Sequence, residues 1–260
     1  MRIAQTLLAL SLAAGSFACG ATSDGQIGEN GEVRFSLVVD FIDNASIDDD
    51  VATHRTLFVA MQHPKRGFLD DETYTKLSLQ VRNEDGELVS SVFPLGFAQY
   101  GVVFEQAGRY KLVAMDGGTQ LDAFSINVRD VDDIALSRRV VVSTTYEDDN
   151  GDTCARVQEL DGIENVVLHE NQSVQMFVVP RASDGADLIG FLALTGDGPD
   201  SVILHSPLVG QGRRANSLIV TPDSTMTPSI RVVIEDADGG HRIDVELPTK
   251  NEPFELDCSD

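Results

Sequence analysis

The stretch Phe124-Ser125-Ile126-Asn127-Val128-Arg129 alternates apolar and polar side chains along its whole length. Successive side chains of a β-strand point to opposite faces of the sheet, so this alternation predicts a strand with one buried face and one solvated face. Antiparallel sheets with one side in water have this pattern, whereas the strands of all-parallel sheets are apolar on both sides. The stretch therefore predicts an antiparallel sheet that packs on a core through one face.

The same alternation recurs along the chain, and turn signals separate the runs. Apolar residues occupy every second position in three further runs: Phe35 to Phe41, Leu77 to Val81, and Ile243 to Leu247. Asn83-Glu84-Asp85-Gly86 and Asp236-Ala237-Asp238-Gly239-Gly240 carry the Gly and Asp residues that tolerate the positive φ of tight hairpins. Long helical periodicity is missing, and its best candidate, 153–160, is short. These patterns predict an all-β protein.

The predicted strands fall into two sets of about seven, which is the number in an immunoglobulin-like sandwich. The first set is 35–42, 56–62, 75–82, 87–93, 100–105, 109–115 and 121–129, and the second is 164–169, 172–179, 188–195, 201–206, 216–221, 229–235 and 241–247. We therefore expect two antiparallel immunoglobulin-like β-sandwiches in tandem. The expected domains are a signal peptide at 1–18, a lipidated Cys19 with a flexible linker at 19–32, a first sandwich at 33–130, an interdomain segment at 131–163, and a second sandwich with a C-terminal tail at 164–260.

One segment of each half resembles a known group of domains. Ala107-Gly108-Arg109-Tyr110-Lys111-Leu112-Val113, followed by Asp116-Gly117-Gly118, resembles the G-x-Y strand near the end of bacterial immunoglobulin-like and PKD-like domains. The resemblance implies that Tyr110 lies at a strand corner and bonds back to the backbone. Leu188-Ile189-Gly190-Phe191 similarly resembles the L-x-G strand of bacterial immunoglobulin-like domains. This architecture hosts many unrelated roles, so the resemblance implies a fold and not a function.

The N-terminus predicts export. Arg2 is followed by an alanine- and leucine-rich run and then by small residues, which is the pattern of a secretory signal. The run is shorter than the ~20 apolar residues of a spanning helix. The segment ending at Cys19 resembles the lipobox of bacterial lipoproteins, in which the cysteine is acylated; Ala18 and Gly20 fit it, and Ser16 and Phe17 depart from it. Ser16-x-Ala18 also suits ordinary signal peptidase, so lipid anchoring and simple secretion are the two alternatives.

The chain has three cysteines, at positions 19, 154 and 258. In an oxidising compartment Cys154 and Cys258 can pair, which leaves Cys19 as the odd one, and lipidation would remove its thiol. The pair would close a loop of about 100 residues, which is worth up to roughly 4.7 kcal/mol in the chain-entropy model. A redox or metal role for the pair is the alternative, but no second ligand lies nearby in the sequence.

The chain is strongly acidic. It has 42 acidic and 19 basic residues and a formal net charge of −23. Nucleic acids and anionic lipid surfaces bind basic patches, so this charge disfavours both as partners. It favours cations, basic partners and solubility.

Clustered acids near the middle of the chain are candidate calcium ligands. Calcium takes six to eight oxygen ligands, and Asp-rich loops at the ends of sandwiches can supply them. The candidates are Asp130, Asp132, Asp133, Asp148, Asp149 and Asp152. The stretch 148–152 lacks the glycine and glutamate spacing of an EF-hand, so that motif is rejected. The alternative is that all of these acids are solvated loop residues.

No catalytic motif stands out in the sequence. No G-x-S-x-G elbow and no phosphate-binding glycine loop occurs, and His169-Glu170 lacks the second histidine of a zinc-protease motif. Our first hypothesis is therefore a non-catalytic protein, anchored through Cys19 to the outer membrane or cell surface, that binds an envelope or extracellular protein through its sandwich loops. The localisation alternative is a periplasmic or secreted protein. The functional alternatives are an exported hydrolase or accessory subunit with a site assembled from distant loops, and a structural component stabilised by calcium. No other cofactor is expected.

Overall fold

The computed structural model describes residues 25–38, 50–64, 76–89, 91–96, 98–147, 153–198, 202–205, 216–222, 228–237 and 240–255. The chain divides into two compact units, and the division does not follow the order of the sequence. Unit 1 comprises Met1–Val131 and also Ala182–Phe191, whereas unit 2 comprises Asp132–Arg181 and Leu192–Asp260. A short piece of the C-terminal half is therefore part of the N-terminal unit.

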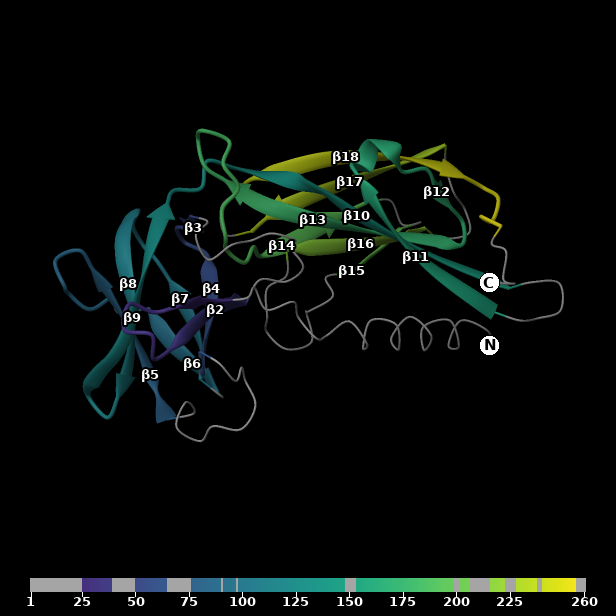
Figure 1. Ribbon diagram of the computed structural model, residues 1–260. Helices are drawn as coiled ribbons and strands as arrows, with labels where there is room; N and C mark the ends of the chain where they lie inside the picture. The colour runs from purple at the N-terminus through teal and green to yellow at the C-terminus, as the bar shows by residue number, and fades with distance from the viewer. Residues whose placement is uncertain are drawn as a thin grey trace. The chain divides into compact units, whose positions relative to one another are not determined.

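Unit 1 is a sandwich of two sheets (Figure 1). The five-stranded sheet has the order β1-β2-β4-β7-β6, and its strands are β1 (Gln26–Ile27), β2 (Arg34–Val38), β4 (Thr56–Gln62), β6 (Val92–Gly96) and β7 (Gln99–Val103). The four-stranded sheet has the order β3-β9-β8-β5, and its strands are β3 (Val51–Ala52), β5 (Ser78–Asn83), β8 (Gly108–Asp116) and β9 (Thr119–Arg129). The strands named here pair in antiparallel fashion, except for the two-residue parallel pairing of β3 with β9.

The apolar alternation builds the core of unit 1. Phe35 and Leu37 of β2, Leu112 of β8, and Ile126 and Val128 of β9 are buried between the two sheets. At the start of β8, the Tyr110 hydroxyl donates a hydrogen bond to the carbonyl of Gln106, 2.9 Å away. This is the return bond of a tyrosine corner, as the resemblance to immunoglobulin-like domains implied.

A buried carboxylate fastens the turn between β1 and β2 to the opposite sheet. Asp122 of β9 is fully buried. Its two oxygens accept hydrogen bonds from the backbone N–H groups of Asn30, Glu32 and Val33, each at 2.8 Å, as well as from the N–H of the residue that follows it. A side chain at Gly28 would place its Cβ 2.4 Å from the carboxylate, so only glycine fits there.

This arrangement corrects the expectation of a flexible linker at 19–32. Residues 25–32 form β1 and the turn that Asp122 holds, and so they belong to the sandwich. The glycines of this stretch provide a tight turn with a close approach to Asp122, in place of the freedom of a tether. Cys19 and the signal segment lie outside the described residues.

Residues 182–191, which we call the strap, complete one edge of unit 1. The Ala52 N–H of β3 donates to the Ile189 carbonyl at 2.8 Å, and the Ile189 N–H donates to the Asp50 carbonyl at 2.9 Å. The strap thus adds hydrogen bonds to the outer side of the short edge strand β3. The Ile189 side chain is 2% exposed and joins the core of unit 1.

Side chains fix the strap at two further points. The Arg129 guanidinium lies between two carboxylates, 2.8 Å from Asp184 of the strap and 3.2 Å from Asp50. Gly190 of the strap lies so close to Arg55 that a Cβ at position 190 would be 2.8 Å from the Cβ of Arg55. The L-x-G segment identified in the sequence therefore contributes to unit 1 instead of forming a strand of the second sandwich.

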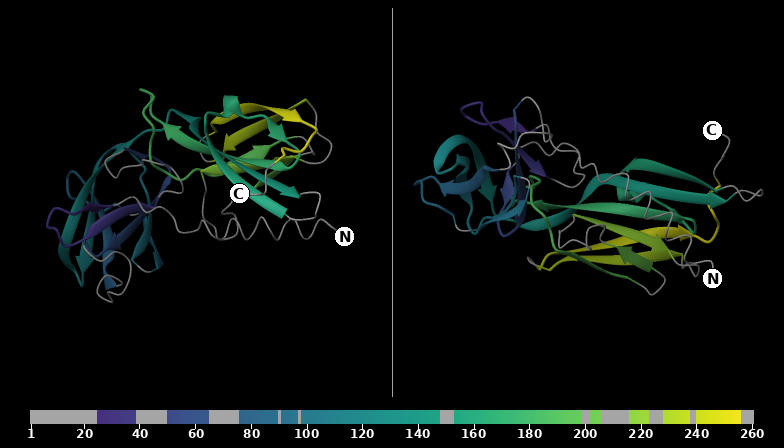
Figure 2. Two further views of the ribbon diagram at one scale, coloured as in Figure 1. Left: turned by 45° about the vertical axis from the view of Figure 1, so that its right-hand side comes forward. Right: turned by 90° about the horizontal axis from the view of Figure 1, so that it is seen from below.

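Unit 2 is also a sandwich of two sheets, which lie face to face (Figure 2). The five-stranded sheet has the order β11-β10-β13-β16-β15, and its strands are β10 (Asp133–Glu147), β11 (Thr153–Asp161), β13 (Gln172–Arg181), β15 (Val202–His205) and β16 (Ser217–Pro222). The four-stranded sheet has the order β12-β18-β17-β14, and its strands are β12 (Leu168–His169), β14 (Leu194–Asp197), β17 (Ser229–Asp236) and β18 (Arg242–Lys250). A 3₁₀-helix, η2 (Ile163–Asn165), follows β11.

The core of unit 2 comes from the alternating faces of both sheets. Val140 and Val142 of β10 and Met176 of β13 face Val232 of β17 and Leu247 of β18 across it. The pairing of β17 with β18 runs in register from Ser229 and Pro248 to Glu235 and Arg242. The two sandwiches confirm the predicted all-β, immunoglobulin-like fold. In the described part of the chain, no helix is both long enough and apolar enough to span a membrane.

The predicted interdomain segment at 131–163 is wrong, because most of it forms β10 and β11 of unit 2. In β10 the register shifts between Leu136 and Val140, which interrupts the period of two on which the sequence prediction depended. The best helix candidate, 153–160, is β11. As an edge strand with both faces largely in water, β11 has no apolar alternation to mark it.

Candidate functional site

Among the described residues, the longest strand at the end of a sheet is β11 of unit 2. β11 pairs with β10 over nine residue pairs, from Arg139 and Asp161 to Glu147 and Thr153, and it is the end strand of its sheet (Figure 1). Seven of its nine residues are exposed and the other two are half-buried. An end strand has one row of backbone N–H and C=O groups without a neighbouring strand, and such a row can pair with another chain.

The other end strands in the described part of the chain are shorter or are protected. Their lengths run from two residues in β1, β3 and β12 to six in β5. β3 is covered by the strap, and β5 is covered by the returning chain, where the Val89 N–H donates to the Val81 carbonyl at 2.8 Å. β6 contains Pro94, which lacks a backbone donor and is tolerated at sheet edges. β11 has neither a proline nor a glycine.

An uncharged strip of side chains runs beside this edge, on the sheet face that points away from the core. It consists of Val141, Ser143, Thr145, Ala155 and Val157. Ser143 lies opposite Val157 and Thr145 opposite Ala155, whereas Val141, at the end of the strip, lies opposite Glu159. Val157 is 54% exposed. In a chain with 42 acidic residues, a neutral strip of this kind is a surface that another protein can approach without charge repulsion.

Charged residues limit the strip at one end. The Arg139 guanidinium lies 3.3 Å from the Glu159 carboxylate across the two strands, and it also lies over the Phe177 ring at 5.5 Å from the ring centre. The turn between β10 and β11, at residues 148–152, lies outside the described residues.

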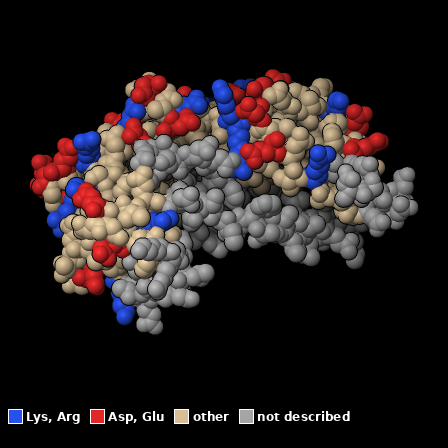
Figure 3. Space-filling model, in the orientation of Figure 1, with Lys and Arg blue, Asp and Glu red and all other residues tan. Residues whose placement is uncertain are grey.

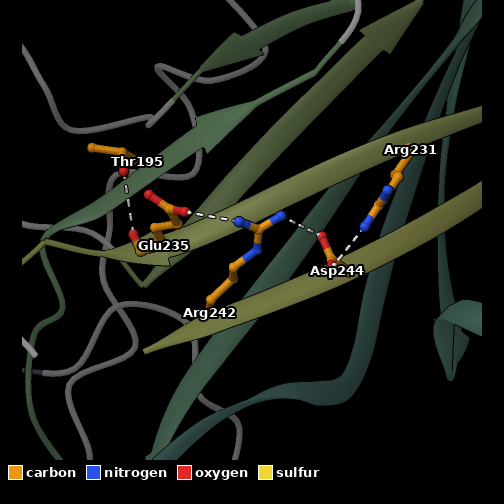
Figure 4. Close-up of polar contacts among 5 residues, drawn as sticks. All are labelled: Thr195, Arg231, Glu235, Arg242 and Asp244. Carbon is orange, nitrogen blue, oxygen red and sulfur yellow. Dashed lines mark hydrogen bonds and ion pairs between the residues drawn. The ribbon is translucent and has the colours of Figure 1, made fainter. Parts of the chain in front are cut away.

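The opposite face of unit 2 has a different character, because its charges pair with one another (Figure 4). On the exposed side of β17 and β18, Asp244 lies 3.0 Å from Arg231 and 3.2 Å from Arg242. Arg242 also lies 3.5 Å from Glu235, whose backbone carbonyl accepts a hydrogen bond from Thr195 of β14 at 3.4 Å. The hydrogen bonds from Arg231 and then Arg242 hold the pKa of Asp244 below its usual range.

We call Arg231, Glu235, Arg242 and Asp244 the charge ladder. Because these charged groups pair with one another, they offer little to a ligand. A shallow depression of about 360 Å³ lies beside it, lined by Arg231, Asp244, Val245 and Glu246. Acidic and basic side chains are likewise interspersed over the described surface that faces the viewer in Figure 3. Exposed ion pairs of this kind contribute little to stability or specificity.

The candidate calcium ligands do not assemble into a site within the described residues. Asp130 accepts a hydrogen bond from the Thr53 hydroxyl at 3.1 Å, and Asp133 accepts one from the backbone N–H of Ile134 at 2.8 Å. Asp132 is exposed. Among the described residues, no group of three or more His, Cys, Asp or Glu side chains is placed to hold a metal ion. Asp148, Asp149 and Asp152 lie outside the described residues, so calcium binding stays a prediction.

The cysteines and histidines give two further observations. Cys154 lies in β11, whereas Cys19 and Cys258 lie outside the described residues, so lipidation and the pairing of Cys154 with Cys258 stay predictions.

His54 lies 3.6 Å from Glu105, but their side chains are 60% and 68% exposed. Catalytic acid–base pairs are typically desolvated in a cleft, and this pair is not.

Comparison with known proteins gives no family. No family model and no curated protein sequence matches the chain. Among solved structures, domains 5–6 of the S-layer protein SbsC are 14% identical, with 82% of this chain and 99% of that chain covered and a TM-score of 0.28. The Lin-41 filamin domain is 18% identical, with 40% of this chain and 97% of that chain covered and a TM-score of 0.25.

A third solved structure belongs to an enzyme. A β-glucuronidase from glycoside hydrolase family 2 is 12% identical, with 87% of this chain and 21% of that chain covered and a TM-score of 0.30. TM-scores as low as these transfer neither an activity nor a partner to this chain.

Proposed function

We propose that this protein is an exported, non-catalytic binding protein, held at the bacterial cell surface by a lipid at Cys19, that takes up an extended segment of an envelope or extracellular protein along β11. The observation that carries the proposal is the edge of β11 from Ala155 to Asp161, beside which the described residues place no second strand. In strand addition, an extended peptide pairs its backbone with a free sheet edge, and neighbouring side chains select the partner.

The surroundings of β11 favour this mode of binding. Its backbone edge supplies hydrogen-bond donors and acceptors in a regular row, because β11 pairs with β10 in unbroken register over its full length. The uncharged strip of Val141, Ser143, Thr145, Ala155 and Val157 supplies contacts for alternate side chains of an added strand. Residues 39–49, 65–75 and 206–215 lie outside the described residues.

The buried polar groups of the described residues support a binding role over a catalytic one. Asp122 holds a turn through backbone N–H groups. Asn216, which is 3% exposed, accepts a hydrogen bond from the Leu192 N–H at 2.7 Å through its side chain and another from the Val178 N–H at 2.7 Å through its carbonyl. These groups hold strands together and do not line a cleft.

Photo-crosslinking in the producing cell tests the proposal. A photoreactive amino acid is placed at Val157 in one variant and, as a matched control, at Leu88, which is 63% exposed and belongs to unit 1. We expect the probe at position 157 to give a discrete adduct with one protein and the probe at position 88 to give none. Equal adducts from both positions, or none from position 157, would contradict binding along β11.

The anchor has a separate test. The apolar run and the segment around Cys19 support lipidation, and two or more acyl chains would give a durable anchor, since each buried methylene contributes about 0.8 kcal/mol. Mass spectrometry of the mature N-terminus is expected to show an acylated Cys19. An unmodified Cys19, or cleavage elsewhere, would replace the anchored protein with a secreted or periplasmic one and would leave the proposal for β11 intact.

A further inference from the structure

The four-stranded sheet of unit 1 carries basic side chains on the face that points away from the core. Side chains of β5 and β8 alternate between the two faces of this sheet. Val81 and Leu112 are buried in the core, whereas Arg82, Arg109 and Lys111 lie on the opposite face. Arg109 and Lys111 are exposed, and Arg82 is half-buried. We call Arg82, Arg109 and Lys111 the basic cluster.

Strand pairing brings the basic cluster together, because β5 and β8 are neighbours in the sheet (Figure 1). Arg82 lies directly opposite Lys111, and Arg109 is two residues from Lys111 on the same face. Paired residues of antiparallel strands have Cα atoms about 5 Å apart, and residues two apart along a strand are about 7 Å apart. The three side chains therefore leave the sheet from one compact group of positions.

This arrangement is unfavourable for folding. Like charges that lie directly opposite each other in a sheet destabilise the pair of strands. The chain has 19 basic residues against 42 acidic ones, and yet it places Arg82 opposite Lys111. Positions at which a protein breaks a local rule of this kind are expected at functional surfaces.

Nearby acids neutralise the basic cluster only in part. Lys111 Nζ lies 2.9 Å from the Glu29 carboxylate. Arg82 donates a hydrogen bond to the neutral side chain of Gln80 at 3.1 Å. Among the described residues, neither Arg82 nor Arg109 forms an ion pair, and the acids in the turn after β5 form none with them. Two guanidinium groups therefore keep a positive charge that the described part of the chain does not pair.

Uncharged polar residues extend the same face onto β9. Ser125 lies opposite Lys111, and Asn127 lies opposite Arg109. Both Ser125 and Asn127 are exposed. A hydroxyl group can donate and accept hydrogen bonds, and so can a side-chain amide, so both suit the hydroxyl groups of a sugar. The face thus combines positive charges with neutral hydrogen-bonding groups.

The edge of the sheet beside the basic cluster is covered by the chain itself. The Val89 N–H donates to the Val81 carbonyl at 2.8 Å, and Leu88 lies opposite Arg82 in a β-bridge. A peptide that adds to a sheet needs an open edge for its backbone hydrogen bonds. The face therefore offers side chains alone, which favours a ligand that binds through charges and hydroxyl groups over an acidic peptide.

We infer that the basic cluster, with Ser125 and Asn127 beside it, binds an anionic polysaccharide. Each arginine fork can make two parallel hydrogen bonds to a carboxylate of the polymer, and the neutral side chains contact its hydroxyl groups. The net charge of the chain does not prevent this contact, because exposed charges are screened beyond about 8 Å at physiological ionic strength. The inference is independent of β11, since β11 belongs to unit 2.

The test measures the affinity of the full chain for polygalacturonate, a polysaccharide with a carboxylate on each sugar, by isothermal titration calorimetry. We expect binding that weakens as the salt concentration rises from 0.1 to 1 M, because the Debye length falls from about 10 Å to about 3 Å. Dextran, which is uncharged, should not bind. An absence of binding to polygalacturonate, or equal binding of dextran, would overturn the inference.

Two double variants separate the basic cluster from the net charge of the chain. Arg82→Gln with Arg109→Gln is expected to raise the Kd about tenfold or more, because it removes two charge-assisted contacts. The matched control, Arg231→Gln with Arg242→Gln, removes the same charge from exposed arginines of unit 2 and should change the Kd less than about twofold. Equal effects of the two double variants would show that no particular face is involved.

A single variant protects the test against a folding defect. Arg109→Gln changes only an exposed side chain, and it is expected to raise the Kd about threefold even where the double variant impairs unit 1. Poly-L-glutamate, which carries carboxylates and no hydroxyl groups, should bind more weakly than polygalacturonate. Equal or tighter binding of poly-L-glutamate would identify an acidic peptide as the ligand of this face and would contradict the inference.

Discussion

The two sandwiches treat their sheet edges differently. In unit 1, Asp122 fastens the turn beside β1, the strap covers β3, and the returning chain at Val89 covers β5. In unit 2, β11 presents nine residues at the end of its sheet and almost all of them are exposed. An uncovered strand edge is a liability unless something pairs with it. The contrast teaches that unit 1 covers several of its sheet edges with its own chain, whereas the longest described edge of unit 2 is exposed, and the proposed binding along β11 depends on that difference.

The largest expected effect comes from removing the Asp122 carboxylate, which holds the turn between β1 and β2. Asp122→Ala would remove the acceptor of the buried Val33 N–H and of the part-buried Glu32 N–H, so we expect a loss of about 3 kcal/mol in the free energy of unfolding. Urea unfolding followed by circular dichroism measures it. The control Asp116→Ala removes an exposed acid at the end of β8 and should change the stability by less than about 0.5 kcal/mol. Equal losses for both variants would mean that the clamp does not stabilise unit 1.

The next effect comes from loosening the strap. Gly190→Ala places a Cβ 2.8 Å from the Cβ of Arg55 and 3.1 Å from that of Ala52, so the strap must shift away from β3. Overpacking of this kind costs about 1–3 kcal/mol. The matched control Ser183→Ala, at an exposed position of the strap, should cost less than about 0.5 kcal/mol. Hydrogen exchange of the Ala52 amide reports the shift directly, and protection that is unchanged in Gly190→Ala would contradict the role of the strap.

The third effect is a dependence of the strap on pH. The hydrogen bond from Arg129 lowers the pKa of Asp184 in the folded protein. A lowered pKa contributes stability that is present above the pKa of the unfolded chain, near 3.9, and is lost as the pH falls through the folded pKa. We therefore expect the unfolding free energies of the natural protein and of Asp184→Asn to differ at pH 6 and to converge as the pH falls below about 4. A difference that is constant with pH would contradict this ion pair.

The smallest expected effect is at the charge ladder of β17 and β18. Asp244 is exposed and lies between two arginines, so Asp244→Asn should leave the thermal unfolding midpoint within experimental error at moderate salt. The same variant should also leave any adduct formed through position 157 unchanged. Loss of that adduct in Asp244→Asn would indicate that the partner binds the sheet of β17 and β18, and it would contradict binding along β11.

Most strands could be predicted from the sequence, because alternation in runs such as Phe124 to Val128 records which face is buried. β10 and β11 could not be predicted. In β10, a register shift between Leu136 and Val140 breaks the alternation. In β11, both faces are largely exposed, so its residues do not alternate between apolar and polar. The strap depends on pairing between distant segments, which no local pattern encodes. The position of Asp122 could have been noticed in the sequence. It lies two residues before Phe124 and four before Ile126, so it falls on the face of the strand that the alternation predicts to be buried.

The candidate site was less predictable than the fold. The acids proposed as calcium ligands attract attention by their number, but Asp130 and Asp133 bond to separate neighbours. An open edge is a property of the order of strands in a sheet, and so it emerges only when β10 is known to pair with β11 on one side and β13 on the other.

Amide hydrogen exchange along β11, resolved by residue in the dilute full-length protein, tests the central claim most directly. A strand that is paired on one side only has protected and unprotected N–H groups in alternation. We predict slow exchange at every second residue between Ala155 and Asp161 and fast exchange at those between them. Uniform protection along this stretch would show that the edge is already covered, and the account of unit 2 as the receiving unit would be wrong.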